Sequence, residues 1–488
     1  MSLQAPRAPV ACPSPPAAPP LESGAPAPPA IELASVTKRY GRHLVLGNLD
    51  LRIAAGTSVV LTGPNGAGKS TLLGLIAGST SPTSGRVTLD GAGDGLGPRS
   101  RGRVLGMLGH TCMLYDRLSG RENLRLHARL RGLPAERVEA VLVQVDMQAA
   151  ADRPVHTYSH GMRKRLSLAR VLLHDPAVLV LDEPFSGLDA QSQDRLARVI
   201  ESLRPTHTIV FSTHDTARAF AHADRVLSLD CGSIAEDRLI EGVVSDRPAG
   251  ATTVGHVQAP SRSASGRFAT AVLAMLGKDL RIEARGRAAS TAMLMLVGLL
   301  AVVLGMAFEP LATDSAVLSG ALWVLITFAA LHGLARSFDA EFHDDALMGL
   351  LLTGADPAAL YLGKVVSTTL LLVAVALASI ALIAVFFGAP ALLGVLPEVL
   401  VLVTLAALGL AAVGGLVSVM ARHSSLGETL LPLLFLPLVV PVLLAGVSSL
   451  PVLLETGTLD PGWLQVLVAF DVGMLVATSV FFEYLLEA

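Results

Sequence analysis

The stretch that decides the fold reads Gly63-Pro64-Asn65-Gly66-Ala67-Gly68-Lys69-Ser70-Thr71. Apolar runs at residues 58–61 and 72–78 flank it, so it lies between an expected strand and an expected helix. In that setting the pattern G-x-x-x-x-G-K-[ST] forms a phosphate-binding loop, because glycines let backbone N–H groups and the helix N-terminus face one anion. We predict that Lys69 reaches the β- and γ-phosphates of a nucleotide and that Ser70 holds Mg²⁺. The alternative is a glycine turn before an ordinary core helix.

A second stretch, residues 177–184, ends in paired carboxylates. Its apolar part is continuous and bounded by prolines, which is typical of a parallel strand covered on both faces. Carboxylates at the tip of a buried strand are costly unless a cation or substrate compensates them. With the phosphate loop on a neighbouring strand, we expect Asp182 to hold Mg²⁺ and Glu183 to polarise a water for attack on the γ-phosphate. The alternative is a solvated acidic pair.

Further polar residues stand at the ends of expected elements. Ser159 and Gly161 open a helical pattern, so they form either a second anion site or an ordinary helix cap. Tyr40 precedes the phosphate loop and either stacks on adenine or packs at a strand end. His214 ends an apolar strand, and residues 186–189 read Ser-Gly-Leu-Asp after Glu183.

Composition divides the chain of 488 residues into two unlike halves. Lys and Arg are common up to about residue 287 and nearly vanish afterwards. The net charge of −3 gives no basic excess, so a nucleic-acid partner is not expected. Residues 1–30 are rich in Pro and Ala, lack the apolar stretch of a signal peptide, and are predicted to be a disordered tail.

The second half contains six apolar runs, each about as long as the roughly 20 residues that a membrane span requires. They cover residues 289–308, 316–334, 365–387, 399–420, 430–450 and 464–482. Lys and Arg occur only in alternate connections, so the positive-inside rule places both termini and the nucleotide domain in the cytoplasm. Asp471 lies inside the sixth run and is expected to face a partner or a cavity.

Residues 241–266 are predicted to be a linker. The helical pattern at residues 268–282, with Lys278, Arg281 and Arg285 nearby, favours a helix lying on an anionic membrane surface over a soluble amphipathic helix. The connection at residues 336–357 is the longest on the cytoplasmic side. We expect it to dock on the nucleotide domain; the alternative is a solvated loop.

The motifs of residues 31–240 resemble those of ATP-binding-cassette (ABC) ATPases in content and order. In the terms of that family they are an aromatic residue (Tyr40), Walker A (63–71), a signature (159–162), Walker B (178–182) with Glu183, a D-loop (186–189) and a switch histidine (His214). The resemblance implies an α/β P-loop domain with a helical subdomain that hydrolyses Mg-ATP. It also implies a head-to-tail homodimer, in which Ser159 and Gly161 of one chain face the γ-phosphate held by the other.

The expected site follows from these assignments. The catalytic residues are Glu183 and His214, and the metal residues are Ser70, Asp182 and His110. The nucleotide-binding residues are Tyr40, Gly63, Pro64, Asn65, Gly66, Ala67, Gly68, Lys69, Ser70, Thr71, Ser159, Gly161 and Asp189. Two segments depart from the family pattern. The signature is Tyr-Ser-His-Gly-Met rather than Leu-Ser-Gly-Gly-Gln, and the Q-loop segment, residues 104–111, contains no Gln, so that either His110 or Thr111 stands in its place.

Residues 278–285, 320–338, 350–352 and 361–364 resemble the haem-exporter membrane subunit of the bacterial cytochrome c maturation system. That resemblance implies a fused ATPase and permease, with an all-α domain of six transmembrane helices at residues 267–488 of an inner-membrane protein. Its expected output is haem export or release of a haem chaperone, beside other cytochrome c maturation subunits. Efflux of a drug, lipid or polysaccharide, and remodelling of a partner complex without transport, remain alternatives.

Overall fold

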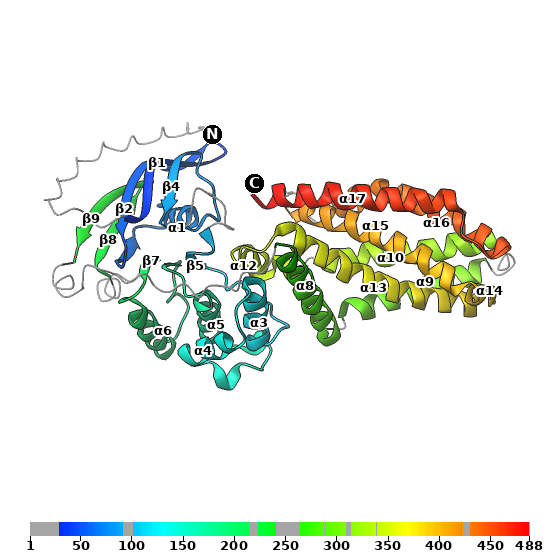
Figure 1. Ribbon diagram of the computed structural model, residues 1–488, viewed down its shortest axis with the longest axis horizontal. Coiled ribbons are helices and arrows are strands. Elements are labelled where there is room, and N and C mark those ends of the chain that lie inside the picture. Colours follow the sequence, from blue (N-terminus) through cyan, green and yellow to red (C-terminus); the bar gives the residue numbers. More distant parts are fainter. Residues whose placement is uncertain are drawn as a thin grey trace, which may run out of the picture. The chain divides into compact units, whose positions relative to one another are not determined.

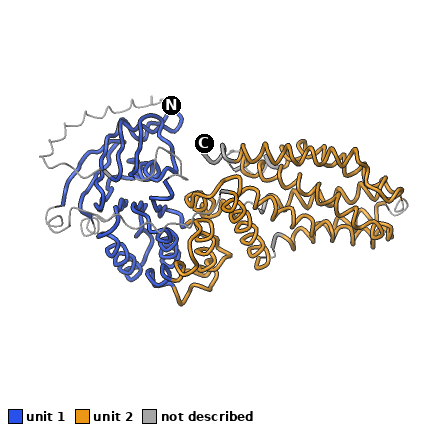
Figure 2. The backbone as a smooth tube through the Cα atoms, viewed as in Figure 1, with its two compact units in different colours: residues 1–112, 140–147, 159–258 blue, residues 113–139, 148–158, 259–488 orange. Residues whose placement is uncertain are grey.

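The computed structural model describes residues 29–90, 101–213, 223–240, 264–286, 288–308, 314–337, 339–422 and 430–487. Most of the predicted tail, most of the linker and His214 lie outside these residues. The chain divides into two compact units (Figure 2). The first comprises residues 1–112, 140–147 and 159–258, and the second comprises residues 113–139, 148–158 and 259–488.

The first unit contains an antiparallel sheet of three strands (Figure 1). Strand β1 (Pro29–Tyr40) lies between β2 (His43–Ala54) and β4 (Ser84–Leu89). Ile31 pairs with Ile53 on one side and with Leu89 on the other, and all three are buried. The strands expected near residues 31–36 and 51–53 are therefore confirmed.

A second sheet of six strands has the order β5-β6-β7-β3-β8-β9. The bounds are β3 (Ser58–Thr62), β5 (Leu105–Leu108), β6 (Val178–Leu181), β7 (Thr208–Ser212), β8 (Arg225–Asp230) and β9 (Ser233–Leu239). All pairings are parallel except that of β8 with β9. Every residue of β6 is buried, as expected for a strand covered on both faces.

The order of these strands corrects one expectation. Strand β7 lies between β3 and β6, so the phosphate loop is not on the strand next to the paired carboxylates. All five residues of β7 are buried, which suits a central position. Parallel strands are joined by crossovers, so their spatial order does not follow from their order in the sequence.

The helices of the first unit pack around this sheet. Helix α1 (Lys69–Ala77) contacts β6 and β7, and α5 (His160–Leu172) contacts β5 and α6 (Ala190–Leu203). Helix α4 (Glu136–Gln144) begins in the second unit and ends in the first. The apolar residues of α1 and β3 share one buried cluster with the three-stranded sheet, and this cluster holds the phosphate loop in place.

The second unit combines helix α3 (Gly120–Arg131) with a bundle of long helices (Figure 1). From residue 264 onward its helices are α8 (Ala264–Gly286), α9 (Ala288–Ala307), α10 (Ser315–Ser337), α11 (Asp339–Phe342), η4 (His343–Asp345), α12 (Ala346–Leu351), α13 (Pro357–Phe386), α14 (Ala391–Gly394), α15 (Leu396–Arg422), α16 (Leu430–Thr456) and α17 (Pro461–Glu487). Among the described residues, six of these helices are long and apolar enough to cross a membrane.

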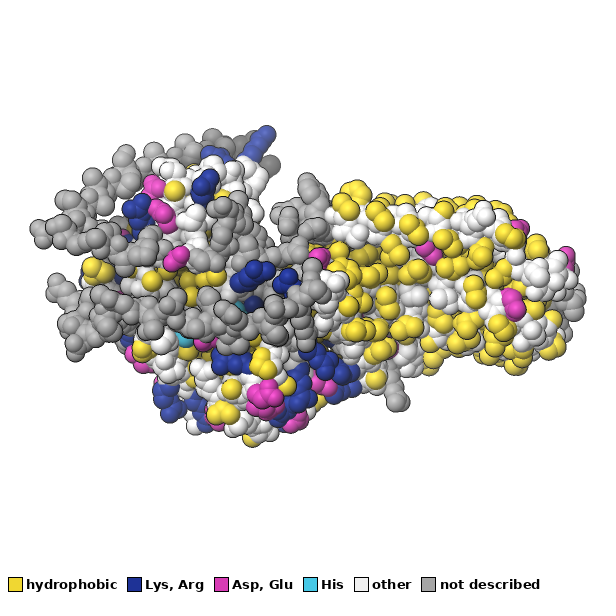
Figure 3. Space-filling model, in the orientation of Figure 1, with side chains coloured by type: hydrophobic (Ala, Val, Ile, Leu, Met, Phe, Trp, Pro, Cys, Tyr) yellow, Lys and Arg dark blue, Asp and Glu magenta, His cyan; other side chains and the backbone are white. Residues whose placement is uncertain are grey.

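These six helices confirm the six predicted spans. The third begins at Pro357, earlier than expected, because Asp356 caps the helix and accepts a hydrogen bond from the Ala358 N–H. The visible face of the bundle is mostly hydrophobic (Figure 3). Helix α15 is its most enclosed member, with 67% of its span buried, against 17% for α17. So much exposed apolar surface requires a lipid environment or a partner.

Asp471 of α17 is buried against Gly409 of α15. Within the described residues, neither of its carboxylate oxygens has a hydrogen-bond partner. A carboxylate at the bilayer centre costs about 2.5–3.5 kcal/mol on insertion scales. We expect Asp471→Leu to raise the melting temperature of the detergent-solubilised protein, and Glu455→Leu, at the exposed end of α16, to leave it unchanged. A lower melting temperature for Asp471→Leu would mean that the carboxylate has an ionic partner.

Candidate functional site

The phosphate loop joins β3 to α1 and depends on glycine. Gly63, Gly66 and Gly68 have φ values of 130°, 82° and 100°, a region that other residues rarely adopt. A Cβ on Gly63 would lie 2.2 Å from the Leu229 carbonyl oxygen, and one on Gly68 would lie 2.8 Å from the Leu46 side chain. The loop backbone is therefore pressed against β8 and β2, and its path excludes larger residues.

The positive groups of the loop face inward. The buried Lys69 ammonium donates hydrogen bonds to the carbonyl oxygens of Gly63, at 2.7 Å, and Pro64, at 3.0 Å. The cap residue of α1, Gly68, has no side chain to accept the first N–H groups of the helix. Those N–H groups, the helix dipole and the ammonium together favour an anion. The residues present thus fit the phosphate chain of a nucleotide.

The paired carboxylates are connected through a residue that sequence reasoning missed. Ser212, at the end of β7, donates a hydrogen bond of 2.6 Å to Asp182 Oδ1 and accepts one of 2.9 Å from the Glu183 N–H. Glu183 has a φ of 46°, a strained conformation for a residue other than glycine. The intervening strand β7 therefore holds the Asp182 carboxylate and the backbone of Glu183. In the sequence, the only sign of this role was the position of Ser212, two residues before the expected switch histidine.

A metal at this place would need ligands beyond protein side chains. Among the described residues, no group of three His, Cys, Asp or Glu side chains is arranged to hold a metal ion. Mg²⁺ commonly binds one or two protein oxygens together with phosphate oxygens and waters. The hydroxyl of Ser70 and the carboxylate of Asp182 fit that pattern.

The signature and D-loop residues cap helices. Ser159 Oγ accepts a hydrogen bond of 3.3 Å from the Met162 N–H at the start of α5. Asp189 accepts one of 2.9 Å from the Ser192 N–H at the start of α6. A Cβ on Gly161 would lie 2.6 Å from Ser192 Oγ, so this glycine lets the two helix starts approach each other. Each residue thus has a structural role within one chain, and its role across a dimer stays a prediction.

A buried set of charges lies in the second unit, and we call it the charged joint. Its members are Tyr115, Lys278 of α8, Asp279 of α8, Glu341 of α11 and Lys364 of α13. Glu341 binds Lys278, lies 2.9 Å from Lys364 Nζ and accepts a hydrogen bond of 2.6 Å from the Tyr115 hydroxyl. Asp279 Oδ1 lies 2.8 Å from Lys278 Nζ and 3.2 Å from Lys364 Nζ. Lys278, Glu341 and Lys364 are at most 4% exposed.

The connection predicted to dock on the nucleotide domain does contact residues 113–131. The Met113 N–H donates a hydrogen bond of 3.0 Å to the Asp344 carbonyl oxygen, and Arg131 Nη2 donates one of 2.7 Å to the Leu352 carbonyl oxygen. His343 Nε2 lies 3.1 Å from Asp116 Oδ2. Docking of this connection on residues 113–131 is therefore confirmed, and the solvated-loop alternative is wrong.

Two of the cations on helix α8 have carboxylate partners within the second unit, and the position of this helix on a membrane surface stays a prediction. Lys278 is 1% exposed within the charged joint, and Arg285 Nη2 donates a hydrogen bond of 2.8 Å to Glu122 Oε1 on α3. Lys278 is thus paired inside the second unit, whereas the Arg285 side chain remains 44% exposed. The helical pattern could not reveal these pairings, because Glu341 and Glu122 come from distant segments of the chain.

Comparison with known proteins supports the predicted family of each half of the chain. The ABC transporter model matches residues 46–186, and the CcmB protein model matches residues 270–484. The Nod factor export ATP-binding protein I of Rhizobium johnstonii is 37% identical over 222 residues, which cover 44% of this chain and 71% of that protein. The chain belongs to the ABC transporter family. Its membrane half is of the CcmB type, so an ATPase domain and a membrane subunit share one multi-pass chain.

Other relatives share the ATPase part. The Fe(3+) ions import ATP-binding protein FbpC of Vibrio cholerae is 37% identical over 211 residues, covering 42% of this chain. This chain spans about 60% of the length of that relative. A solved dimeric ATP-binding cassette in a post-hydrolysis state, bound to ADP and Pi, is 26% identical, covers 43% of this chain and 99% of its own, and has a TM-score of 0.40.

Residues 109–112, which overlap the segment expected to correspond to the Q-loop, are hydrogen-bonded to α5. Lys164 is 2% exposed and donates hydrogen bonds to the carbonyl oxygens of Gly109, at 3.2 Å, and His110, at 3.0 Å. Ser167 Oγ donates one of 2.7 Å to the Cys112 carbonyl oxygen. These three hydrogen bonds join α5 to residues 109–112.

Two expected site residues are exposed in this ABC transporter. Tyr40 is 52% exposed at the end of β1, so it is not a packed strand-end aromatic, and Lys38 Nζ lies 4.8 Å from its ring centroid. The His110 side chain is exposed, and its role as a metal residue stays a prediction.

The charged joint predicts a pH dependence. Burial alone would raise the pKa of Glu341, but the ammonium groups of Lys278 and Lys364 lower it to about 2, from an ordinary value of 4.5. A depressed carboxyl pKa adds stability above the unfolded-state value, and this stability is lost as the pH falls through the folded-state value. We expect the melting-temperature difference between wild type and Glu341→Gln to be constant above about pH 5 and to shrink between pH 4.5 and 2. A difference that stays constant down to pH 2 would contradict this assignment.

Proposed function

We propose that this chain is an ATP-driven half-transporter that works as a homodimer. The observation that carries the proposal is the arrangement Asp182–Ser212–Glu183 in the same sheet as the phosphate loop. According to this proposal, Lys69, Ser70 and Asp182 hold Mg-ATP. The bound nucleotide supplies a phosphoryl group for transfer to water.

The protein groups have separate tasks in this proposal. Glu183 accepts a proton from the attacking water, and its backbone, held by Ser212, keeps the carboxylate in place. His214 contacts the γ-phosphate; it lies outside the described residues. Ser159, Gly161 and Asp189 of one chain complete the site of the other, as in the family that this chain belongs to.

In this proposal, the charged joint transmits a displacement of residues 113–131 to the membrane helices. Tyr115 stands between the Q-loop segment and α3, and its hydroxyl binds the same carboxylate that holds Lys278 and Lys364. Because Lys364 is on α13, a displacement of residues 113–131 would pull directly on a membrane helix. Buried charge networks resist rearrangement, since an unpaired buried charge is costly.

The proposed output is haem export, or release of a haem chaperone, for cytochrome c assembly in the bacterial inner membrane. The CcmB-type match over residues 270–484 supports this output, while the iron-import and Nod-factor-export relatives resemble only the ATPase part. The distribution of Lys and Arg favours a cytoplasmic ATPase domain and cytoplasmic termini.

Deletion of the gene tests this output. We expect loss of covalent haem attachment to c-type cytochromes, measured by haem staining. The wild-type chain should restore attachment, whereas Lys69→Ala should not. Normal attachment in the deletion strain would contradict the haem proposal while leaving the ATPase proposal intact, since hydrolysis by the purified protein is measured separately.

A further inference from the structure

A small pocket of about 90 Å³ lies between α3 and α8 in the second unit. The apolar part of its wall consists of Leu118, Leu126 and Ala274, which belong to one buried cluster. The other lining residues are charged: Glu122, Arg125, Arg129, Lys278 and Arg281. None of the functions proposed above uses this space.

Two of these charged residues already have partners. Both carboxylate oxygens of Glu122 accept hydrogen bonds from the Arg285 guanidinium. The Lys278 ammonium is paired with Glu341 and with Asp279 inside the charged joint. Neither side chain is therefore left to bind a ligand of its own.

The three arginines of the pocket differ in this respect. Arg125, Arg129 and Arg281 are exposed, and within the described residues none of their guanidinium groups has a hydrogen-bond or ion-pair partner. Arg121 and, to a smaller extent, Arg125 lower the pKa of Asp152, but that carboxylate accepts its hydrogen bonds from Arg121. Three like charges around one pocket repel one another, and an anion between them removes that repulsion.

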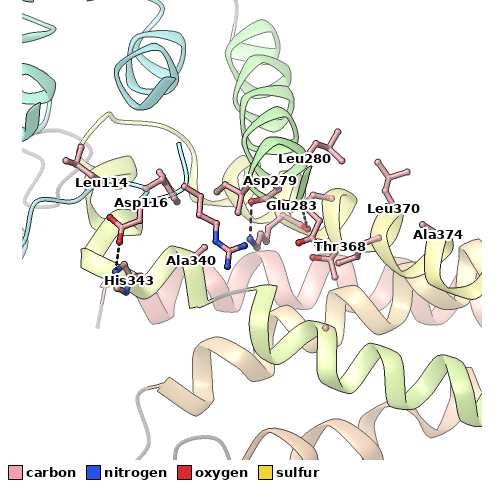
Figure 4. Close-up of a pocket in the computed structure, with 17 residues that line it drawn as sticks. Leu114, Asp116, Asp279, Leu280, Glu283, Ala340, His343, Thr368, Leu370 and Ala374 are labelled. Atoms are coloured by element: carbon pink, nitrogen blue, oxygen red, sulfur yellow. Dashed lines mark hydrogen bonds and ion pairs between the residues drawn. The ribbon is translucent and has the colours of Figure 1, made fainter. Parts of the chain in front are cut away.

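Contacts with α13 set the depth of α8 in a membrane. Lys364 is the only charged residue of α13, and residues 365–386 match the roughly 20 residues of a membrane span. Asp279 of α8 lies 3.2 Å from Lys364 Nζ and accepts a hydrogen bond of 2.6 Å from the Ser367 hydroxyl (Figure 4). This part of α8 is therefore level with the end of the span, where lipid headgroups begin. In Figure 1, α8 runs across the long axis of the bundle, as a helix on a membrane surface does.

One side of α8 is apolar and uncovered. Leu273 and Leu280 are 65% and 49% exposed, and because they are two helical turns apart they share that side. Arg281 lies about 100° further round the helix, on the side that faces α3. On an interfacial helix the apolar side enters the acyl-chain region while a neighbouring cation stays among the headgroups. An anion held at Arg281 can thus belong to a lipid whose chains pass Leu280.

The chemistry and the size of the pocket select a phosphate group. Guanidinium groups bind phosphate oxygens through paired N–H donors. At about 10–15 Å³ for each atom the size of a water, the space takes roughly six to nine such atoms. This is enough for a phosphate group, and the rest of a lipid must lie outside the pocket.

We propose that this pocket binds the phosphate of one anionic phospholipid from the leaflet that meets α8. Arg125, Arg129 and Arg281 hold the phosphate oxygens, and the acyl chains lie against Leu280. A zwitterionic lipid is disfavoured, because its own cation would approach three arginines. The bound lipid joins α3 to α8 and thereby adds to the contact that Glu122 already makes with α8.

Lipid retention tests the proposal on the full chain. The protein is reconstituted in nanodiscs that contain equal amounts of phosphatidylglycerol and phosphatidylcholine, released into detergent, and examined by native mass spectrometry. We expect wild type to retain phosphatidylglycerol at one per chain, in preference to phosphatidylcholine. Arg281→Gln, and Arg125→Gln combined with Arg129→Gln, remove charged donors to the phosphate, so each variant should lower this retention at least about tenfold.

Arg267→Gln is the matched control, because Arg267 is an exposed arginine of the same helix outside the pocket. It should retain lipid as wild type does. All four substituted arginines are exposed, so the melting temperature should stay unchanged in every variant. Equal retention of both lipids, unchanged retention in Arg281→Gln, or an equal loss in Arg267→Gln would each overturn the proposal.

Free phosphate is another source of the same chemistry. Calorimetric titration of the delipidated protein in detergent compares inorganic phosphate with a short-chain phosphatidylglycerol. We expect the lipid to bind more tightly, because only the lipid also covers Leu280. Equal affinities would assign the pocket to free phosphate and overturn the lipid proposal, as would a failure of both to bind. Neither measurement involves ATP hydrolysis or haem, so such a failure would leave the proposed function intact.

Discussion

Glu183→Gln is expected to lower the rate of ATP hydrolysis by about 10²–10⁴-fold, the usual effect of removing a general base. Gln has nearly the same shape as Glu but cannot accept a proton from the attacking water at neutral pH. The backbone of residue 183 keeps its hydrogen bond to Ser212, because that bond involves the N–H group alone. ATP binding should therefore persist, as measured with a fluorescent nucleotide, while phosphate release almost stops.

Glu236→Gln is the control for this measurement. Glu236 is an exposed residue of β9, so its substitution should leave hydrolysis unchanged. Equal hydrolysis by wild type and Glu183→Gln would show that another group activates the water. Loss of ATP binding in Glu183→Gln would instead indicate a collapsed site, and a crystal structure or a melting curve would distinguish this outcome.

Glu341→Leu is expected to destabilise the protein by about 3–5 kcal/mol, because it removes the carboxylate shared by two buried ammonium groups. For a unit of this size the loss corresponds to a fall in melting temperature of about 10 °C. ATP hydrolysis should also become less responsive to the membrane environment, since Tyr115 loses its partner. Thermal unfolding in detergent, followed by tryptophan fluorescence, measures the first effect.

A second substitution separates charge from packing. Lys278→Met added to Glu341→Leu removes one of the two ammonium groups that lose Glu341, leaves Asp279 to Lys364, and should recover a large part of the lost stability. Glu136→Leu, at an exposed position on α4, should have little effect. If Glu341→Leu melts at the wild-type temperature, or if Lys278→Met makes it worse, the joint does not act as a set of mutually compensating charges.

Some features of this protein could be predicted because they are local in sequence. The phosphate loop is nine consecutive residues whose glycines are required by the backbone path, and each membrane helix is one continuous apolar run. The carboxylates Asp182 and Glu183 follow a strand that is buried along its whole length. In such cases the pattern and the structure are set by the same few neighbouring residues.

Other features depend on segments that are far apart in the chain. Ser212 reaches Asp182 only because β7 inserts beside β6, and no local pattern specifies the order of parallel strands. In the sequence Lys278 resembles an interfacial cation, whereas in the structure it is buried against Glu341 and Tyr115. Ser159 and Asp189 matched the family pattern, yet within one chain their side chains serve as helix caps.

The sequence by itself determined that the chain joins an ABC-type ATPase domain to six membrane helices, because contiguous motifs and apolar runs carry that information. Only the tertiary structure decided how the catalytic carboxylates are held, which charges connect residues 113–131 to α13, and how arginines of α3 and α8 come to line one pocket. The physical reason is that buried polar groups must find partners, and those partners are chosen by packing in space rather than by distance along the chain.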